Sequence, residues 1–413
     1  MRLLFVALLI CTSAAFAEEP SSQPASQPAS PPAEPSAPPK AIEPAPLPHE
    51  DRMFNPVIGV DEEGPLPYEG AKETSFRLFV HGYIRARASA AETDAAAPFV
   101  GTNNGFNLAH ARLELTAGYG NKLWLRFSLD GAFDRGNGFT GAVAQTGAGN
   151  VVAAFRDAYI AYQPFQPLRF TIGQFRAPFD EEALTSTAKL LFVSRALPSQ
   201  GVRATEGFFV PGLSPDRELG LRISGEELHL SERVYVSYFA AITNGNGPNV
   251  NANDNNHISI WGRLELQVPF VRFAAAGMFN PITYGTYPNL FDEQKWGVTG
   301  DVRFEWNGLE FLGQFMFVQT KYTSTGAPTV NAMGAHGQVG YKLFFGLQPA
   351  YRIAWLEPND RISGDQLLYH TFGLNYELPW VPIKVFVNYS LTGEQSARSI
   401  KNNLFECLVQ AVF

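Results

Sequence analysis

From residue 76 to the end of the chain, apolar and polar side chains alternate in runs of about ten residues. In the first run, Phe76, Leu78 and Val80 alternate with Arg77 and His81. A period of two places all the apolar side chains on one face of a β-strand. Glycine, asparagine, aspartate and proline separate the runs, and we find no long amphipathic helix outside one loop. The pattern therefore predicts an all-β protein.

About sixteen such runs can be counted, an even number, as expected of a single-chain bacterial β-barrel. Fourteen or eighteen strands fit the same pattern if the boundaries shift by a few residues. Short turns such as 118–121 and 305–308 alternate with longer polar stretches such as 135–149 and 244–256. The predicted strands are 76–89, 106–119, 121–134, 150–163, 167–176, 217–225, 233–243, 257–268, 271–281, 295–307, 308–322, 332–345, 347–357, 366–379, 382–393 and 402–413. The predicted fold class is a transmembrane antiparallel β-barrel.

Alternation alone also fits a soluble β-protein, and composition favours the membrane. The chain contains 33 Phe and 15 Tyr, and aromatic residues such as Phe270, Tyr376 and Trp380 fall near strand ends, as in a membrane-interface girdle. A mean hydropathy of −0.09 excludes a helical membrane protein but fits a barrel with a polar lumen. No cysteine pair, metal motif or cofactor motif is present, so we expect no cofactor and no metal.

The final strand ends on an aromatic residue. Phe405, Cys407, Val409, Ala411 and Phe413 form one apolar face. The closing strand of a membrane barrel must pair to its last residues, because no unpaired edge is stable in lipid. We therefore expect Phe413 to be part of the signal that the outer-membrane barrel assembly machinery recognises. The alternative is an ordinary terminal strand.

The N-terminal region predicts export. Arg2, the apolar run 3–10 and the small residues around Phe16 predict a signal peptide over residues 1–17. Residues 18–75, rich in proline, alanine and serine, predict a disordered periplasmic linker and lead-in, with a contact to the cell wall as the alternative. The barrel domain then covers residues 76–413, and Cys407 has no partner for an intrachain disulfide once the signal peptide is removed.

Charge is distributed unevenly. The net charge is −8, yet the polar faces of the strands are rich in arginine. An arginine facing lipid would cost a few kcal/mol near the midplane, so we expect these side chains to line an aqueous lumen that attracts anions. The candidate pore-lining residues are Arg77, Arg85, Arg87, Arg112, Arg126, Lys189, Arg195, Arg203 and Arg222. The alternative is scaffolding by ion pairs, as suggested by Arg303 beside Asp301 and Glu305.

The long segment 177–216 interrupts the strands, and its start (180–192) predicts one or two helical turns. Long loops in compact folds are usually functional. We expect this segment to fold into the lumen and narrow it, with Arg195, Arg203 and Lys189 facing a permeating anion. The acidic residues 180–182 count among the surplus acids of the loops. The alternative is an external cap.

A family resemblance extends over most of the barrel region. Residues 155–162, 173–179, 216–220 and 244–247 resemble, in order, the signature of the phosphate-selective porin O and P family. This resemblance implies a sixteen-stranded barrel, usually a trimer, that passes anions through an arginine-lined constriction. Ser194 stands where the family often has an acidic residue, and the dense row of basic residues typical of the phosphate-selective members is absent.

The sequence thus predicts an outer-membrane porin for passive diffusion of small hydrophilic solutes, with a preference for phosphate, polyphosphate or other small anions. The expected partners are outer-membrane lipid, permeant anions, the assembly machinery and two further copies in a homotrimer, without nucleic acid. A barrel-type hydrolase is the enzyme alternative, but no Gly-x-Ser-x-Gly or His-Glu-x-x-His motif occurs, and His81, His110 and His336 are expected in the lumen. A plugged structural or adhesive barrel is the third possibility.

Overall fold

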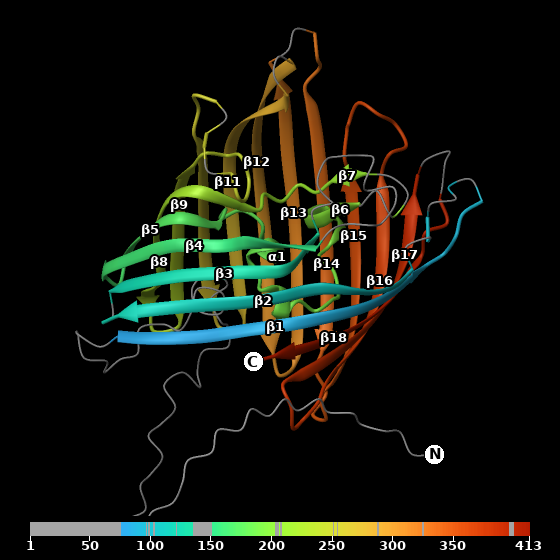
Figure 1. The fold of residues 1–413 in the computed structure, drawn as a ribbon, viewed down its shortest axis with the longest axis horizontal. Coiled ribbons are helices and arrows are strands. Elements are labelled where there is room, and N and C mark those ends of the chain that lie inside the picture. The colour runs from blue at the N-terminus through green and yellow to red at the C-terminus, as the bar shows by residue number, and fades with distance from the viewer. Residues whose placement is uncertain are drawn as a thin grey trace, which may run out of the picture. The chain divides into compact units, whose positions relative to one another are not determined.

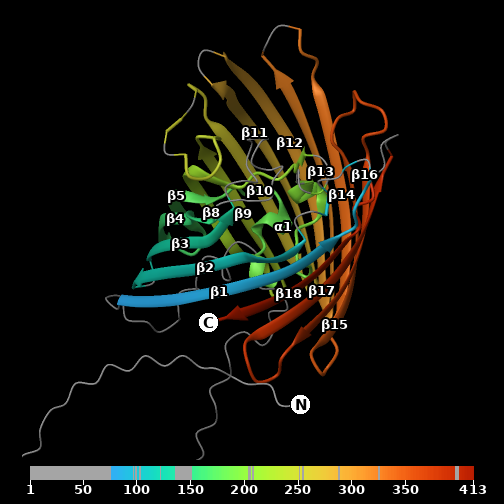
Figure 2. The ribbon, with the colours of Figure 1, turned by 45° about the vertical axis from the view of Figure 1, so that its right-hand side comes forward.

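A computed structural model of the chain describes residues 76–413, apart from residues 96, 98–99, 102–103, 121, 135–150, 203–205, 207–208, 251, 254, 287–288, 324–325 and 396–399. The predicted signal peptide and linker (1–75) and the candidate Arg203 lie outside the described residues. The described residues form a closed antiparallel β-barrel (Figures 1 and 2). None of the helices in this part of the chain is long and apolar enough to cross a membrane.

Sixteen strands close the barrel, and each pairs antiparallel with its neighbours. They are β1 (Phe76–Ala91), β2 (Gly105–Tyr119), β3 (Leu123–Asp134), β4 (Val151–Phe165), β5 (Leu168–Arg176), β8 (Arg217–Ser231), β9 (Val234–Thr243), β10 (Ser259–Val268), β11 (Val271–Thr286), β12 (Asn289–Trp306), β13 (Leu309–Tyr322), β14 (Val330–Tyr341), β15 (Leu347–Glu357), β16 (Leu367–Glu377), β17 (Ile383–Glu394) and β18 (Leu404–Val412). The prediction of a sixteen-stranded barrel is confirmed.

The segment between β5 and β8 contains the short elements of the fold. These are α1 (Glu181–Leu184), the 3-10 turn η2 (Thr187–Lys189), α2 (Leu197–Gln200) and the two-stranded pair β6 (Gly201–Val202) and β7 (Val210–Pro211). The helical turns expected over 180–192 are therefore present.

Strands β11 and β12 are longer than the pattern predicts. The pattern predicts that one strand ends at residue 281 and the next begins at 295, whereas residues 282–286 pair with 289–294. Thr283 lies opposite Asp292, and its hydroxyl donates to the carboxylate at 2.6 Å. Where both faces of a hairpin carry polar residues, side chains need not alternate, so the hydrophobic period gives no signal there.

Burial alternates along the strands as expected for a barrel in lipid. On β1, Phe76, Leu78 and Ile84 are exposed on the outer face, whereas Tyr83 and Arg85 are buried on the inner face. Aromatic residues at strand ends, such as Phe344 and Trp380, are almost fully exposed. The apolar side chains therefore point outwards and the charged side chains point into the lumen, as the sequence predicted.

The two ends of the barrel differ in their connections. One end, here called the short-turn end, has tight hairpins such as 307–308, where Asn307 and Gly308 adopt φ values of 48° and 82°. Positive φ at both central residues is the conformation that a two-residue type I′ turn requires. The other end, here called the long-loop end, has longer connections such as 244–258 and 358–366, and segment 177–216 begins and ends there.

Phe413 and Gly82 close the barrel at the seam between β1 and β18. The Phe413 amide donates to the Gly82 carbonyl at 2.9 Å, and the Gly82 amide donates to the Phe413 carbonyl at 3.0 Å. A Cβ added to Gly82 would lie 2.3 Å from the Phe413 ring and 2.6 Å from the Arg112 carbonyl oxygen. The absence of a side chain at residue 82 thus lets the aromatic ring lie flat across the seam.

We predict that Gly82→Ala destabilises the barrel by about 1–3 kcal/mol, because the new methyl group overlaps backbone as well as a ring. Urea unfolding of the refolded protein in lipid vesicles, followed by tryptophan fluorescence, measures this change. Gly262→Ala is the matched control, since a Cβ there would meet no atom within 4 Å. Equal stability of the two variants would contradict the role given to the seam.

Candidate functional site

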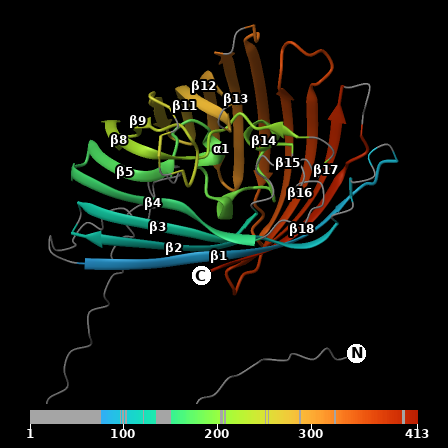
Figure 3. The same cartoon turned by 45° about the horizontal axis from the view of Figure 1, so that its top comes forward.

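Segment 177–216 contacts the inner wall of the barrel on the side opposite its own strands. Arg85 on β1 donates to the Val193 carbonyl (3.3 Å), Asn375 on β16 to the Leu191 carbonyl (2.8 Å), and Gln410 on β18 to the Ala188 carbonyl. Figure 3 shows α1 within the ring of strands. Three strands far from β5 and β8 therefore bind successive parts of the segment.

The first anchor of the segment is the carboxylate of Glu181. Glu181 is fully buried and forms ion pairs with Arg263 (2.8 Å), Arg272 and Arg303 (3.4 Å). Arg272 and Arg303 lie directly opposite each other on β11 and β12, where two like charges repel. Arg263 on β10 also binds Asp301 with two hydrogen bonds of 2.9 and 3.0 Å. The carboxylate of Glu181 thus compensates a cross-strand pair of cations, and we call this group the Glu181 network.

The second anchor is Glu182. Its carboxylate accepts from the Ala196 amide (2.5 Å) and pairs with Arg352 of β15 (3.4 Å), and its carbonyl accepts from Arg195. The segment therefore folds back on itself between residues 182 and 196. Asp180 begins α1 by accepting a hydrogen bond from the Glu182 amide, as N-cap residues do.

These contacts correct one interpretation of the sequence. The pattern places residues 180–182 among the surplus acids of the loops, whereas all three are buried inside the barrel. The basic partners of Glu181 and Glu182 are far away in the chain, 82 positions from Glu181 to Arg263 and 170 positions from Glu182 to Arg352. The local pattern gives no indication of such partners.

Apolar residues 190–193 fill the space between the two anchors and the wall. Phe192 lies 4.5 Å beneath the guanidinium of Arg352, and Val193 packs against Phe386 and Leu408. A Cβ added to Gly340 would lie 2.8 Å from Leu191. The glycine on the wall therefore permits a close approach that a larger residue would prevent.

Several predicted pore-lining arginines are paired with acids on neighbouring strands. Arg112 binds Asp130 (3.3 Å), and Arg126 binds Glu114 (3.0 Å). This arrangement matches the scaffolding alternative that the sequence left open. These two guanidinium groups line the barrel but add little net charge to it.

Three other predicted pore-lining arginines, Arg77, Arg87 and Arg222, each contact a different kind of group. Arg87 pairs with Glu406 of β18 (3.1 Å), although its own strand offers no acid. Arg77 donates to the Gly120 carbonyl (2.6 Å) at the short-turn end, and Arg222 lies 5.0 Å over the Phe175 ring.

Arg85 and Arg195 are the two predicted residues that the structure brings together. Arg85 donates to the Val193 carbonyl and lies 5.6 Å over the Phe386 ring. Arg195 donates to the carbonyls of Glu182 and Thr185 and to the Thr187 hydroxyl. Neither forms an ion pair with any residue that the structure describes.

A third guanidinium joins them from β15. Arg352 donates to the Ser194 carbonyl at 2.9 Å, next to the carbonyl that Arg85 binds. Arg85 and Arg352 thus bind the carbonyls of the two residues that precede Arg195, and we call Arg85, Arg195 and Arg352 the arginine cluster. The sequence placed Arg352 on an inner face but did not include it among the candidates, because nothing near it in the chain indicates residue 194 as its partner.

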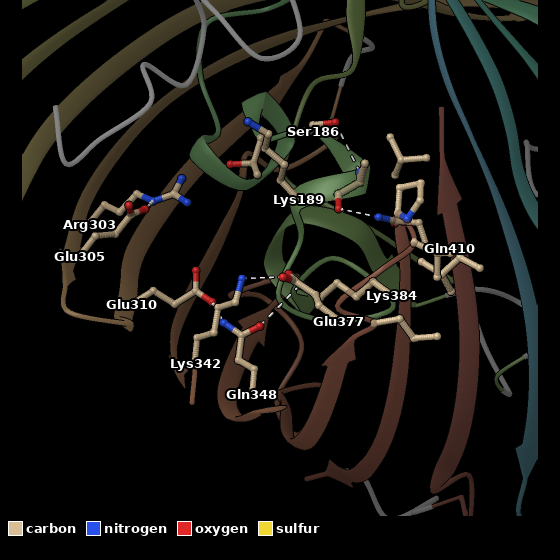
Figure 4. A pocket seen from close by; sticks show the side chains of 17 residues that line it. Ser186, Lys189, Arg303, Glu305, Glu310, Lys342, Gln348, Glu377, Lys384 and Gln410 are labelled. Atoms are coloured by element: carbon tan, nitrogen blue, oxygen red, sulfur yellow. Dashed lines mark hydrogen bonds and ion pairs between the residues drawn. The ribbon is translucent and has the colours of Figure 1, made fainter. Parts of the chain in front are cut away.

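Two cavities flank the segment. The larger, about 670 Å³, lies at the short-turn end and is lined by Lys189, Arg303 and Lys384 among others (Figure 4). The smaller, about 100 Å³, lies towards the long-loop end and is lined by Arg195 and Arg352. We call them the short-turn cavity and the long-loop cavity. Within the described residues, no group of three or more acidic, histidine or cysteine side chains is placed to bind a metal.

Comparison with known proteins supports the porin class that the sequence predicts. Residues 80–237 match the family described as phosphate-selective porin O and P. A comparison with curated proteins found no match. Among solved structures, the outer membrane channel DcaP of Acinetobacter baumannii is similar with a TM-score of 0.56 and 15% identity, covering 83% of this chain and 100% of that one.

Two further solved structures share the fold. The anion-selective porin from Comamonas acidovorans has a TM-score of 0.54 at 10% identity, covering 82% of this chain and 100% of that one. The trimer form of OmpT from Vibrio cholerae has a TM-score of 0.52 at 9% identity, with coverage of 82% and 100%. At such low identity these likenesses concern the fold.

A closed sixteen-stranded barrel with an apolar outer face and a charged lumen is the architecture of outer-membrane channels. The chain is an outer-membrane porin, and its resemblance to the phosphate-selective porin O and P family, predicted from the sequence, is confirmed over residues 80–237.

Glu181→Gln should release the segment from the wall. The variant leaves the buried guanidinium groups of Arg263 and Arg272, and the partly exposed one of Arg303, without their shared carboxylate, and breaking a buried ion pair costs about 3–5 kcal/mol. We expect a lower free energy of unfolding in urea and faster cleavage by trypsin after Lys189. Glu293→Gln, which removes an inner-face carboxylate paired with Lys295, is the control. Unchanged trypsin cleavage would show that Glu181 does not hold the segment.

The Glu181 network should also make stability depend on pH. Burial would raise the pKa of Glu181, but Arg272, Arg263 and Arg303 outweigh burial and hold the pKa below its ordinary value of 4.5. A lowered folded-state pKa stabilises the fold above the ordinary pKa of 4.5, and this stabilisation is lost as the pH falls from there through the folded-state pKa. The difference in unfolding free energy between the wild type and Glu181→Gln should therefore be constant at neutral pH and shrink as the pH falls below about 5. Parallel curves would contradict this.

Proposed function

We propose that this porin prefers anions and that segment 177–216 forms the constriction of its lumen. The observation that carries the proposal is the arginine cluster, in which Arg85 and Arg195 have no acidic partner among the described residues. Fixed cations without counter-charges raise the local concentration of anions and repel cations. We further propose that the protein acts as a channel and not as an enzyme.

The position of the cluster supports this proposal. Elsewhere on the wall, Arg112, Arg126 and Arg263 are compensated by carboxylates, so their fields largely cancel. Arg195 and Arg352 of the arginine cluster line the long-loop cavity, and Arg85 binds the carbonyl of Val193 close by. A solute that crosses this cavity would pass these guanidinium groups. Selectivity would then depend on a few uncompensated charges at the narrowest part and not on the number of arginines in the barrel.

The chemistry of the cluster suits phosphate or carboxylate groups. A guanidinium presents parallel N–H donors that match two oxygens of such an anion. The family description names phosphate, and one protein of similar fold is described as anion-selective. Small phosphates, polyphosphates and carboxylates are therefore the proposed permeants.

We also propose a homotrimer, supported by the trimer form of one structure of similar fold. Residues 1–17 would direct export and 18–75 would form the periplasmic linker. The assembly machinery would recognise Phe413, and the short-turn end would face the periplasm, as in bacterial barrels generally.

Reversal potentials in planar bilayers under a salt gradient test the selectivity. Arg195→Gln and Arg85→Gln should each lower the anion-to-cation permeability ratio, by roughly fivefold if each charge contributes about 1 kcal/mol at close range. Arg361→Gln, which removes an equal charge from an exposed loop at the long-loop end, should change the ratio little.

Other outcomes would overturn separate parts of the proposal. A cation-favouring wild type would remove the anion preference but leave the channel. Absence of conductance by correctly folded protein would instead favour a plugged structural barrel. An unchanged ratio in both arginine variants would place selectivity outside the cluster.

A further inference from the structure

The short-turn cavity is lined by charges of both signs and by an apolar rim (Figure 4). Its volume of about 670 Å³ lies within the range of sites that enclose a small organic solute. It lies on the other side of the segment from the long-loop cavity, and the arginine cluster does not line it. A simple anion vestibule would not require its acidic residues.

Basic groups occupy one part of this cavity. Arg303 of β12 uses Nε for Glu305 (2.6 Å) and Nη1 for Glu181 (3.4 Å), and its Nη2 donates to no described residue. Lys189, on the segment, faces the same space and is exposed. These groups can bind one carboxylate of a solute.

An acidic group that forms no ion pair with the described residues lies beside them. Glu310 of β13 is directly opposite Glu305, a cross-strand pair of like charges that disfavours the sheet. Glu305 is compensated by Arg303, but Glu310 forms no ion pair within the described part of the chain. It accepts a hydrogen bond only from the Gln348 amide, at 2.5 Å. A second cation would therefore be stabilised at Glu310.

A small recess beside the cavity has the size for such a cation. It measures about 20 Å³, enough for a group the size of one water, and Glu310 lines it together with Arg303 and Lys189. Gln338 of β14 also lines the recess, and its buried Oε1 has no hydrogen-bond partner. A carboxylate and an amide oxygen thus face the recess as acceptors, which suits the three donors of an ammonium group.

The apolar rim completes the site. Leu378, Val381, Pro382 and Ile383, in the turn between β16 and β17 and at the start of β17, line the cavity at the short-turn end. An apolar side chain of a solute would contact this rim while its charged groups reach the strands.

We propose that the short-turn cavity binds a small zwitterion of the α-amino acid class with an apolar side chain. Its carboxylate pairs with Arg303 and Lys189, its ammonium with Glu310 and Gln338, and its side chain packs on the rim. The two charged groups of an α-amino acid share one carbon, so their partners must be adjacent, as Arg303 and Glu310 are on neighbouring strands. The inference rests on the channel function, because the solute reaches this cavity through the open end of the barrel.

Three probes of one carbon skeleton test the inference. L-leucine carries both charges, 4-methylpentanoate lacks the ammonium, and 3-methylbutylamine lacks the carboxylate. We expect leucine, added to one side of a bilayer containing the full-length porin, to reduce the ion current with increasing concentration. Each single-charge probe should be at least about tenfold weaker, since a charge-assisted hydrogen bond is lost.

Glu310→Gln should weaken leucine at least about tenfold, to the level of 4-methylpentanoate, because the uncharged amide keeps the shape but not the charge. Glu293→Gln on β12, an inner-face carboxylate outside the cavity, should bind leucine like the wild type. The change in electrophoretic mobility between heated and unheated protein verifies that each barrel is folded.

Equal effects of leucine and 4-methylpentanoate would overturn the inference in favour of a plain anion vestibule. Equal effects of leucine and the amine, or no effect of any probe, would overturn it as well. Reversal potentials recorded in the same bilayers separate the two proposals. A non-selective channel that binds leucine refutes the anion preference alone, whereas an anion-selective channel that ignores leucine refutes the zwitterion site alone.

Discussion

Within the hydrocarbon of a membrane, every backbone N–H and C=O must find a partner inside the protein. The sixteen strands meet this requirement only as a closed ring, in which the last pairing joins β18 to β1. Gly82 and Phe413 complete that ring, with the aromatic ring lying over the residue that has no side chain. Because the ring is closed, one face of each strand points to lipid and must be apolar. The charged residues of the strands can therefore lie only inside.

Charges gathered in a lumen repel one another unless they are compensated, and the protein compensates them from two sources. Arg112 and Arg126 find acids on adjacent strands, as a barrel wall commonly provides. The cross-strand cations Arg272 and Arg303 instead receive Glu181 from the inserted segment. The electrostatics of the wall therefore hold the segment in place. Within the arginine cluster, Arg352 pairs with Glu182 of the segment, whereas Arg85 and Arg195 form no ion pair with any described residue.

The segment lines two cavities that differ in their residues. The long-loop cavity is lined by Arg195 and Arg352 of the cluster together with Glu206 and Glu406, whereas the short-turn cavity combines Arg303 and Lys189 with Glu310 and an apolar rim. Both cavities thus carry charges of both signs, but of the two only the long-loop cavity is lined by the cluster. Different solutes would be retained at different depths of the same channel.

The sequence by itself determined the fold class and the sixteen strands, because the side chains of a strand in a barrel have a period of two that a short run reveals. The two-residue turn at Asn307 and Gly308 was visible for the same local reason. The sequence missed the paired ends of β11 and β12, residues 282–286 and 289–294, where that period is absent. Only the tertiary structure decided which charges are compensated. Arg87 meets Glu406 across 319 residues and Glu181 meets Arg272 across 91, distances over which no periodicity carries information. It also decided that Arg85 and Arg195, which are candidates from the sequence, lie beside Arg352, which is not. Arg85 and Arg352 bind the carbonyls of residues 193 and 194, and the path of this part of the segment depends on the whole barrel.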